Sequence, residues 1–142
     1  MHSTRNELIR GIPLPKKGTK YVARASRFSN SSVPVVIAIR DMLHLASTMK
    51  EVKQIVHKKM LKINGKTVSD LHQPIPLFGI LHADKDYRLS VLTSGRFNFE
   101  ETHDLNRATK VVGKIILSGG VIQYGLHDGT NIVSKENISV GD

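Results

Sequence analysis

The chain has 142 residues, a net charge of +9 and a sequence pI of about 10.0. It contains no cysteine, which excludes a disulfide framework and any metal site built from thiolates. No apolar run approaches the roughly 20 residues of a membrane-spanning helix, and the N-terminus lacks the apolar segment of a signal peptide. We therefore expect a soluble, cytoplasmic protein with no membrane association, made of one domain or two small ones.

Positive charge is concentrated in the first half of the chain. Residues 1–30 contain seven Lys and Arg against one acidic residue, and residues 31–68 contain seven against two. Residues 69–142 contain seven against nine. A basic half beside a slightly acidic half indicates one surface that faces a polyanion, whereas a charge that served only solubility would not need this segregation.

Residues 1–32 are predicted to form a basic, extended N-terminal arm. The prolines in residues 12–15 disfavour a helix, because each biases the preceding residue toward extended geometry. Residues 21–24 have the composition of a short strand, and residues 27–32 that of a linker. The alternative is a solvated, disordered tail, which could still order on binding. The cations predicted to contact phosphates are Arg5, Arg10, Lys16, Lys17, Lys20, Arg24 and Arg27.

A first helix is predicted over residues 33–45. Ser32 is a candidate N-cap, and Pro34 is tolerated in a first turn because its missing N–H has no intrahelical partner there. Apolar residues recur at helical spacing from Val36 onward. Arg40 falls largely outside this apolar stripe and is expected to face outward.

A second helix is predicted to start at Ser47 or Thr48. Thr48 and Glu51 have the spacing of a capping box, in which each side chain accepts a hydrogen bond from the other residue's backbone N–H. Val52 and Val56 belong to its predicted buried face. After the helix, Asn-Gly at residues 64–65 predicts a type I′ hairpin turn between two short strands.

One basic surface is predicted on this helix and hairpin. Residues three or four apart on a helix are neighbours, and the helix N-terminus adds backbone N–H groups that suit a phosphate. Aromatic residues make up only 5% of the chain, which favours recognition of folded RNA through phosphates and 2′-hydroxyls over base stacking. The alternative is an ordinary exposed lysine face. The predicted RNA-binding residues here are Arg40, Ser47, Thr48, Lys50, Lys53, His57, Lys58, Lys59, Lys62, Asn64 and Lys66.

Residues 71–142 are predicted to form a central, β-rich domain with a small antiparallel sheet or partial barrel. Strand candidates occupy residues 77–81, 87–92, 96–99, 111–117, 121–126 and 130–133. The predicted fold class is therefore α+β, with a small helix–helix–hairpin RNA-binding domain at residues 33–70 followed by this β domain. The last residues have the composition of a strand start, so we expect the chain to stop at a domain boundary.

No catalytic residue, metal site or cofactor is predicted. The histidines lack the spacing of clustered metal ligands, and the glycines before Lys20 and Lys114 lack the spacing of a P-loop. His127 and Asp128 are adjacent and point apart, and Asp128-Gly129 is accounted for as a hairpin turn. We therefore expect a binding protein rather than an enzyme.

The stretch LASTMKEVKQIVHKKMLKING, residues 45–65, resembles the small RNA-binding domain named after a bacterial small-subunit ribosomal protein. The resemblance rests on the Ala-Ser-Thr helix start, Glu51, Lys53, the Ile-Val pair at residues 55–56 and the Ile-Asn-Gly turn. One departure is Met49, where that domain usually places a basic residue. The domain also occurs in rRNA pseudouridine synthases, in some aminoacyl-tRNA synthetases and in heat-shock RNA-binding proteins, so it implies RNA binding and little more.

The wider chain resembles the S-four-e family of small-subunit ribosomal proteins of archaea and eukaryotes. The matching stretches are residues 17–24, 33–43 and 87–89, and the Leu-His-Asp-Gly-Thr-Asn-Ile run at residues 126–132, which is closer to the archaeal branch. The family's opening residues and its C-terminal KOW-type barrel are not matched. The resemblance implies a structural constituent of the small ribosomal subunit that binds rRNA beside neighbouring ribosomal proteins, and we expect a monomer in isolation. The alternatives are a free-standing RNA-binding factor and the RNA-binding part of an rRNA-modifying enzyme.

Overall fold

The structure is a computed structural model that describes residues 2–27 and 30–142. Residue 1 and residues 28–29 lie outside the described residues, and the latter belong to the linker predicted over residues 27–32. No helix of the described part is long and apolar enough to cross a membrane.

The chain divides into two compact units, Met1–Leu105 and Asn106–Asp142. This division differs from the predicted boundaries after residues 32 and 70. The first unit contains the predicted arm, the helices and the predicted hairpin, so every residue of the predicted RNA-binding surface lies in one compact body.

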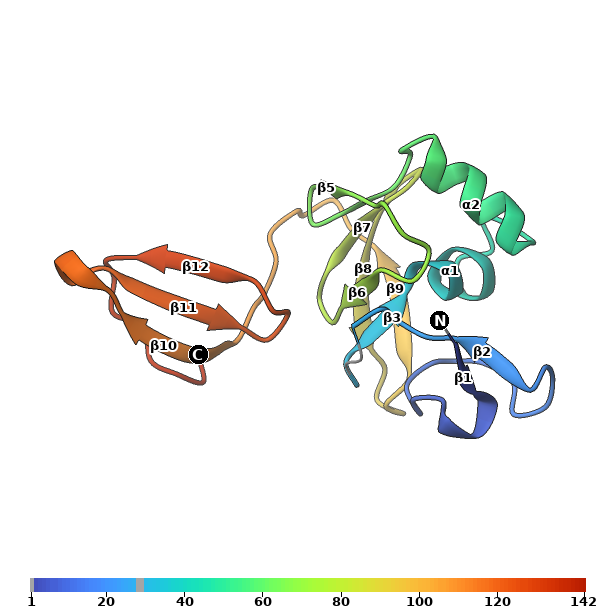
Figure 1. Ribbon diagram of the computed structural model, residues 1–142, viewed down its shortest axis with the longest axis horizontal. Coiled ribbons are helices and arrows are strands. Elements are labelled where there is room, and N and C mark those ends of the chain that lie inside the picture. The colour runs from blue at the N-terminus through green and yellow to red at the C-terminus, as the bar shows by residue number, and fades with distance from the viewer. Residues whose placement is uncertain (1, 28–29) are drawn as a thin grey trace. The chain divides into compact units, whose positions relative to one another are not determined.

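A five-stranded antiparallel sheet forms the centre of the first unit, in the order β5-β4-β7-β8-β9 (Figure 1). Its strands are β4 (Lys62–Ile63), β5 (Lys66–Thr67), β7 (Ile80–His82), β8 (Asp86–Val91) and β9 (Phe97–Glu101). The predicted type I′ turn is confirmed, with Asn64 and Gly65 both at positive φ (51° and 84°). Strand β4 also pairs with β7, which places Ile63 opposite Leu81.

The α+β class is confirmed in its coarse form, as helix combined with antiparallel sheet. The hairpin, however, belongs to the same sheet as the later strands, and the predicted separate helix–helix–hairpin domain is not found. The strand predicted over residues 77–81 is also displaced, because Phe78 has a φ of +60° and Gly79 N–H bonds back to Pro76 O at 2.9 Å. That turn leaves only Ile80–His82 to pair as β7.

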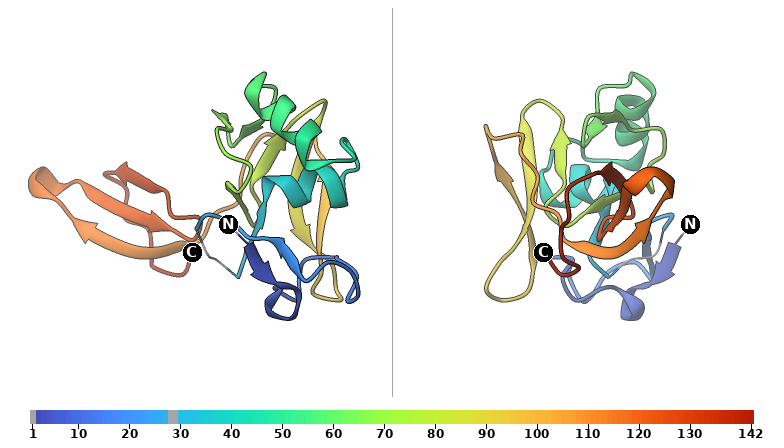
Figure 2. Two further views of the ribbon diagram at one scale, coloured as in Figure 1. Left: turned by 45° about the vertical axis from the view of Figure 1, so that its right-hand side comes forward. Right: turned by 90° about the vertical axis from the view of Figure 1, so that its left-hand side faces the viewer.

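The first helix is shorter than predicted. It comprises α1 (Val35–Ile37) and the π-helical turn η2 (Ala38–Met42), and Pro34 rather than Ser32 is its N-cap. Ser32 instead opens β3 (Ser32–Pro34), which pairs with β6 (Pro74–Pro76), because the residues before a proline favour extended geometry. The second helix, α2 (Met49–His57), lies with α1 on one side of the sheet, as both views in Figure 2 show.

The N-terminal residues fold back on the first unit instead of extending from it. Strand β1 (His2–Thr4) pairs with β2 (Tyr21–Ala23), and the 3-10 turn η1 (Arg5–Glu7) follows β1. Ile12 is 6% exposed within the core, and Gly11 O accepts a 2.7 Å hydrogen bond from Phe97 N–H. A Cβ on Gly11 would lie 2.8 Å from the Phe97 ring. The prediction of an extended arm is therefore wrong, because its apolar residues are buried rather than solvated.

One apolar core joins these elements of the first unit. Val36 and Ile39 from the first helix, Val52 from α2, and Leu81 and Leu89 from the sheet are all fully buried within it. Burying each such side chain contributes about 1.5–3 kcal/mol. This shared core fixes the position of α2, which carries the predicted phosphate-binding residues Lys50 and Lys53 and leads directly into Lys58 and Lys59.

The second unit is a three-stranded antiparallel meander, in the order β10-β11-β12. Its elements are β10 (Val111–Ile116), the 3-10 turn η3 (Ser118–Gly120), β11 (Ile122–Leu126) and β12 (Asn131–Ser134), which confirms the three strands predicted here. Tyr124 is 1% exposed, and its hydroxyl donates to Glu136 O and accepts from Ile138 N–H at 2.9 Å. These bonds hold the C-terminal residues against the sheet.

Candidate nucleic-acid interface

Helix α2 begins as the sequence predicts. Thr48 is the N-cap, and its Oγ1 accepts a hydrogen bond from Glu51 N–H at 3.3 Å. Glu51 Oε2 accepts in turn from the backbone N–H of Ser47 at 2.7 Å and of Thr48 at 3.3 Å. The only carboxylate of α2 is therefore held by the backbone at the helix start, and the capping-box prediction is confirmed.

The outer face of α2 is cationic. Val52 and Val56 are buried against the core, whereas the predicted basic residues Lys50, Lys53, His57 and Lys58 are all exposed. Within residues 2–27 and 30–142, no ion pair uses a lysine of α2 or of the β4–β5 hairpin. These lysines therefore present uncompensated positive charge to the solvent.

The β4–β5 hairpin adds two exposed lysines, but its third predicted RNA-binding residue, Asn64, is used within the protein. Lys62 and Lys66 are exposed on the β4–β5 hairpin, where Lys62 is paired with Thr67 and Lys66 with Ile63. Asn64 accepts a 2.9 Å hydrogen bond from Ile80 N–H through Oδ1, and its own N–H donates to Ile80 O at 2.9 Å. Asn64 thus ties the turn to β7, a role that uses its side-chain oxygen within the protein.

The folded N-terminal segment places cations beside the start of α2. A hollow of about 620 Å³ is lined by residues that include Arg5, Lys17, Arg40 and Met49. Met49, which is 41% exposed, stands where the small RNA-binding domain usually has a basic residue. Cations from other segments line the hollow next to this position. Arg40 forms an ion pair with its neighbour Asp41 at 3.0 Å, which compensates part of this charge.

Arg5 has a structural role that the sequence did not predict. Its guanidinium donates to Pro15 O at 2.6 Å, to Thr19 O at 2.7 Å and to Thr19 Oγ1 at 3.1 Å. These three charge-assisted hydrogen bonds tie the guanidinium to the loop between β1 and β2. The other predicted cations of this segment are exposed: Arg10, Lys16, Lys17, Lys20, Arg24 and Arg27.

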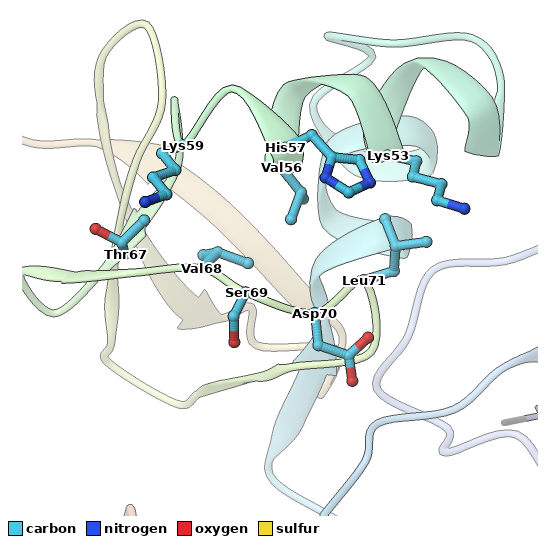
Figure 3. A pocket seen from close by; sticks show the side chains of 9 residues that line it. All are labelled: Lys53, Val56, His57, Lys59, Thr67, Val68, Ser69, Asp70 and Leu71. Carbon is cyan, nitrogen blue, oxygen red and sulfur yellow. The ribbon is translucent and has the colours of Figure 1, made fainter.

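A second hollow, of about 560 Å³, lies between the C-terminal half of α2 and the residues that follow β5 (Figure 3). We call it the α2 groove. Lys53, His57 and Lys59 form its upper rim in Figure 3, and Thr67, Ser69 and Asp70 form the side below. Its lining is completed by the apolar side chains Val56, Val68 and Leu71. The sequence predicted the lysines but not residues 67–71, because backbone hydrogen bonds to other segments, from Val68 N–H to Leu61 O and from Val36 N–H to Leu71 O, bring them opposite α2.

Lys59 reaches the α2 groove through an unusual backbone conformation. Its φ is +55°, in the left-handed region. Lys59 N–H bonds to Val56 O at 2.9 Å and Met60 N–H bonds to Ile55 O at 3.3 Å, the pattern of a Schellman helix end. That position is usually glycine, so lysine occupies it at a cost in backbone strain.

The groups considered for catalysis have structural partners. His127 Nδ1 accepts from Lys110 N–H at 3.1 Å, and Asp128 accepts from Thr130 N–H at 3.0 Å while pairing with Arg107 at 2.7 Å. Burial acts to raise the pKa of Asp128, but the Thr130 hydrogen bonds and the Arg107 charge outweigh it and leave the pKa lowered. Among the described residues, no group of three or more potential ligands is placed to hold a metal ion.

The chain is similar to known ribosomal proteins. A family model described as "Ribosomal family S4e" matches residues 83–142. The small ribosomal subunit protein eS4 of Methanocella arvoryzae is 28% identical, over 99% of this chain and 63% of that protein. The eS4 protein of Haloarcula marismortui is 30% identical, over 96% of this chain and 62% of that protein.

A solved structure agrees with these sequence relatives. The crystal structure of the 30S ribosomal protein S4e from Thermoplasma acidophilum is 26% identical and superposes with a TM-score of 0.64. The match covers 78% of this chain and 60% of that one. The chain thus spans a little under two thirds of the length of the relatives it matches.

Proposed function

Because this chain is a relative of the S4e family of small-subunit ribosomal proteins, we propose that it is a constituent of the small subunit and binds rRNA through its first unit. The named relatives are ribosomal proteins, a family of structural components rather than of enzymes. The chain would act in the cytoplasm, on the ribosome, beside neighbouring ribosomal proteins. Binding would be the whole of its activity.

The observation that carries the proposal is the uncompensated cationic face of α2. Lys50, Lys53 and Lys58 are exposed and form no ion pair in the described part of the chain, while the nearby carboxylate of Glu51 is used by the helix start. Unpaired lysines on a fixed helix release the counterions of a nucleic acid when they meet its phosphates. The exposed cations of the N-terminal segment enlarge the same surface.

The test measures the affinity of the chain for an archaeal small-subunit rRNA transcript over a series of salt concentrations. We expect log K to fall steeply with log[salt], with each lost phosphate contact lowering the slope by roughly 0.7–0.9. The triple variant Lys50→Glu, Lys53→Glu, Lys58→Glu should therefore have a weaker affinity and a shallower slope.

The matched control reverses the same number of charges in the second unit, at Lys110, Lys114 and Lys135. Both triple variants carry the same net charge, so general attraction to a polyanion falls equally in the two. A larger loss in the α2 variant supports the proposed surface. Equal losses, or an unchanged affinity in the α2 variant, would show that the surface is elsewhere.

A further inference from the structure

The α2 groove has two chemically different sides. Lys53, His57 and Lys59 lie on one side, and Thr67, Ser69 and Asp70 lie on the other (Figure 3). The apolar lining is formed by the partly exposed Leu71 and by Val56 and Val68, which are largely buried at 8% and 2% exposed. A ligand that matches this arrangement has an anionic group that meets the lysines, a hydroxyl donor near Asp70 and a weakly polar body.

A ribonucleotide has these features. Its phosphate suits the lysines, its ribose hydroxyls suit the carboxylate, and its sugar or base can pack on Leu71. The volume of about 560 Å³ lies within the usual range for a site that encloses a small ligand. We propose that the α2 groove holds one nucleotide of the bound RNA and that Asp70 accepts a hydrogen bond from the 2′-hydroxyl of this nucleotide. This inference rests on the proposed binding of rRNA.

Asp70 is the residue that gives this site its selectivity. It is the only acidic side chain of the α2 groove, and an ionised carboxylate can only accept hydrogen bonds. Its Oδ1 accepts from His72 N–H at 3.3 Å, and no hydrogen bond to Oδ2 is found in the described part of the chain. A carboxylate repels phosphates, so it benefits RNA binding only where a donor faces it. The 2′-hydroxyl is such a donor, and DNA lacks it.

Lys59 provides a second, independent indication. A lysine in the left-handed region is strained, and strain at one residue points to a function when the local structure enforces it. The Schellman hydrogen bonds fix this conformation, and the resulting chain direction brings the Lys59 side chain to the rim above Thr67 (Figure 3). The Lys59 ammonium group therefore lies at the rim of the groove beside Thr67, where it can meet a phosphate.

The experiment is interference mapping on the full chain with an archaeal small-subunit rRNA transcript in which single 2′-deoxynucleotides are incorporated at random. We expect at least one position where loss of the 2′-hydroxyl weakens binding to the wild-type chain by about tenfold or more, the size of one hydrogen bond to a charged group. With Asp70→Ala, the same position should show less than about a twofold effect. Overall affinity of this variant for rRNA should fall by less than about tenfold, because removal of a negative charge near the phosphates offsets part of the lost hydrogen bond.

The control is Glu100→Ala, which removes an exposed carboxylate of β9 outside the α2 groove. It changes the net charge equally and should leave every interference position as in the wild type. Identical interference maps for wild type and Asp70→Ala would overturn the assignment of Asp70 while leaving rRNA binding intact. If the wild-type chain does not bind rRNA at all, the proposed function itself is refuted.

Because the chain has no cysteine, a single Ser69→Cys variant gives a unique attachment point in the α2 groove. A photo-cross-linker on this residue should join to the rRNA nucleotide identified by interference, and one on Ser94→Cys in the β8–β9 turn should not. Uridine monophosphate at micromolar concentration should leave this cross-link unchanged. Blocking by the free nucleotide at that concentration would overturn the proposal in favour of a mononucleotide site.

Discussion

Replacing Lys59 with glycine should stabilise the protein and lower its affinity for rRNA. Lys59 has a φ of +55°, whereas its neighbour Lys58 has an ordinary helical φ of −73°. Both are exposed lysines at the end of α2, but only Lys59 lines the α2 groove. The variants Lys59→Gly and Lys58→Gly therefore remove the same charge from adjacent positions that differ in backbone conformation.

The magnitude follows from two opposing effects. The left-handed conformation costs a residue with a Cβ about 1–2 kcal/mol, and glycine removes this cost. Glycine also gives the unfolded chain more freedom, which lowers stability by about 0.4–1 kcal/mol. Lys59→Gly should therefore raise the free energy of unfolding by about 0.5–1 kcal/mol. Lys58→Gly relieves no strain and should lower it by a similar amount.

The assay is urea unfolding of the full chain, followed by far-ultraviolet circular dichroism. The two variants should shift the midpoint in opposite directions, with equal slopes, so that the difference reports native-state stability. The same preparations are then tested for rRNA binding, where Lys59→Gly should lose more affinity than Lys58→Gly. Midpoints that shift in the same direction by the same amount would refute the strain argument.

Two further predictions concern the electrostatic anchors of each unit. Asp128→Asn should speed backbone amide exchange in β11 by about tenfold or more, because the 2% exposed carboxylate loses its pairing with Arg107. The pKa of Asp128 is lowered in the folded state, so the ionised carboxylate stabilises the fold above a pH of about 4, and this contribution is lost as the pH falls toward the pKa of the folded state. The asparagine variant should flatten this pH dependence, measured as hydrogen exchange at several pH values. Arg5→Ala should speed exchange at Tyr21 and Ala23 in β2, since three hydrogen bonds to the β1–β2 loop are lost, and Arg10→Ala, which removes an exposed charge only, should not. Unchanged exchange in Arg5→Ala would mean that the core contacts of this segment hold it without the arginine.

Features fixed by neighbours in the chain were predictable from the sequence. The capping box at Thr48, the positive-φ turn at Asn64 and the three strands after residue 110 each depend on a few adjacent residues, and the structure has them all. The cationic face of α2 follows from helical periodicity, which needs no knowledge of the rest of the fold. Two of the stretches that carry the resemblances, residues 45–65 and 126–132, include these features.

Features that depend on distant contacts were decided by the tertiary structure. The N-terminal segment reads as an extended arm, yet Ile12 is buried and Gly11 meets Phe97, a residue far along the chain. The sequence predicts β4 and β5 as an isolated hairpin, whereas the pairing of β4 with β7 joins this hairpin to the later strands in one sheet. Sequence periodicity cannot reveal such pairings, because it records which residues are apolar and not which distant residues cover them.

The α2 groove shows the same division most clearly. The sequence by itself determined that lysines cluster on α2 and that the chain's positive charge lies in its first half. Only the tertiary structure decided that Asp70 lines the same hollow as Lys53 and Lys59, because hydrogen bonds such as Val36 N–H to Leu71 O hold this stretch of chain below the helix. It also decided that Lys59 adopts the left-handed conformation, since a helix end of this kind is set by the path of the chain that follows it.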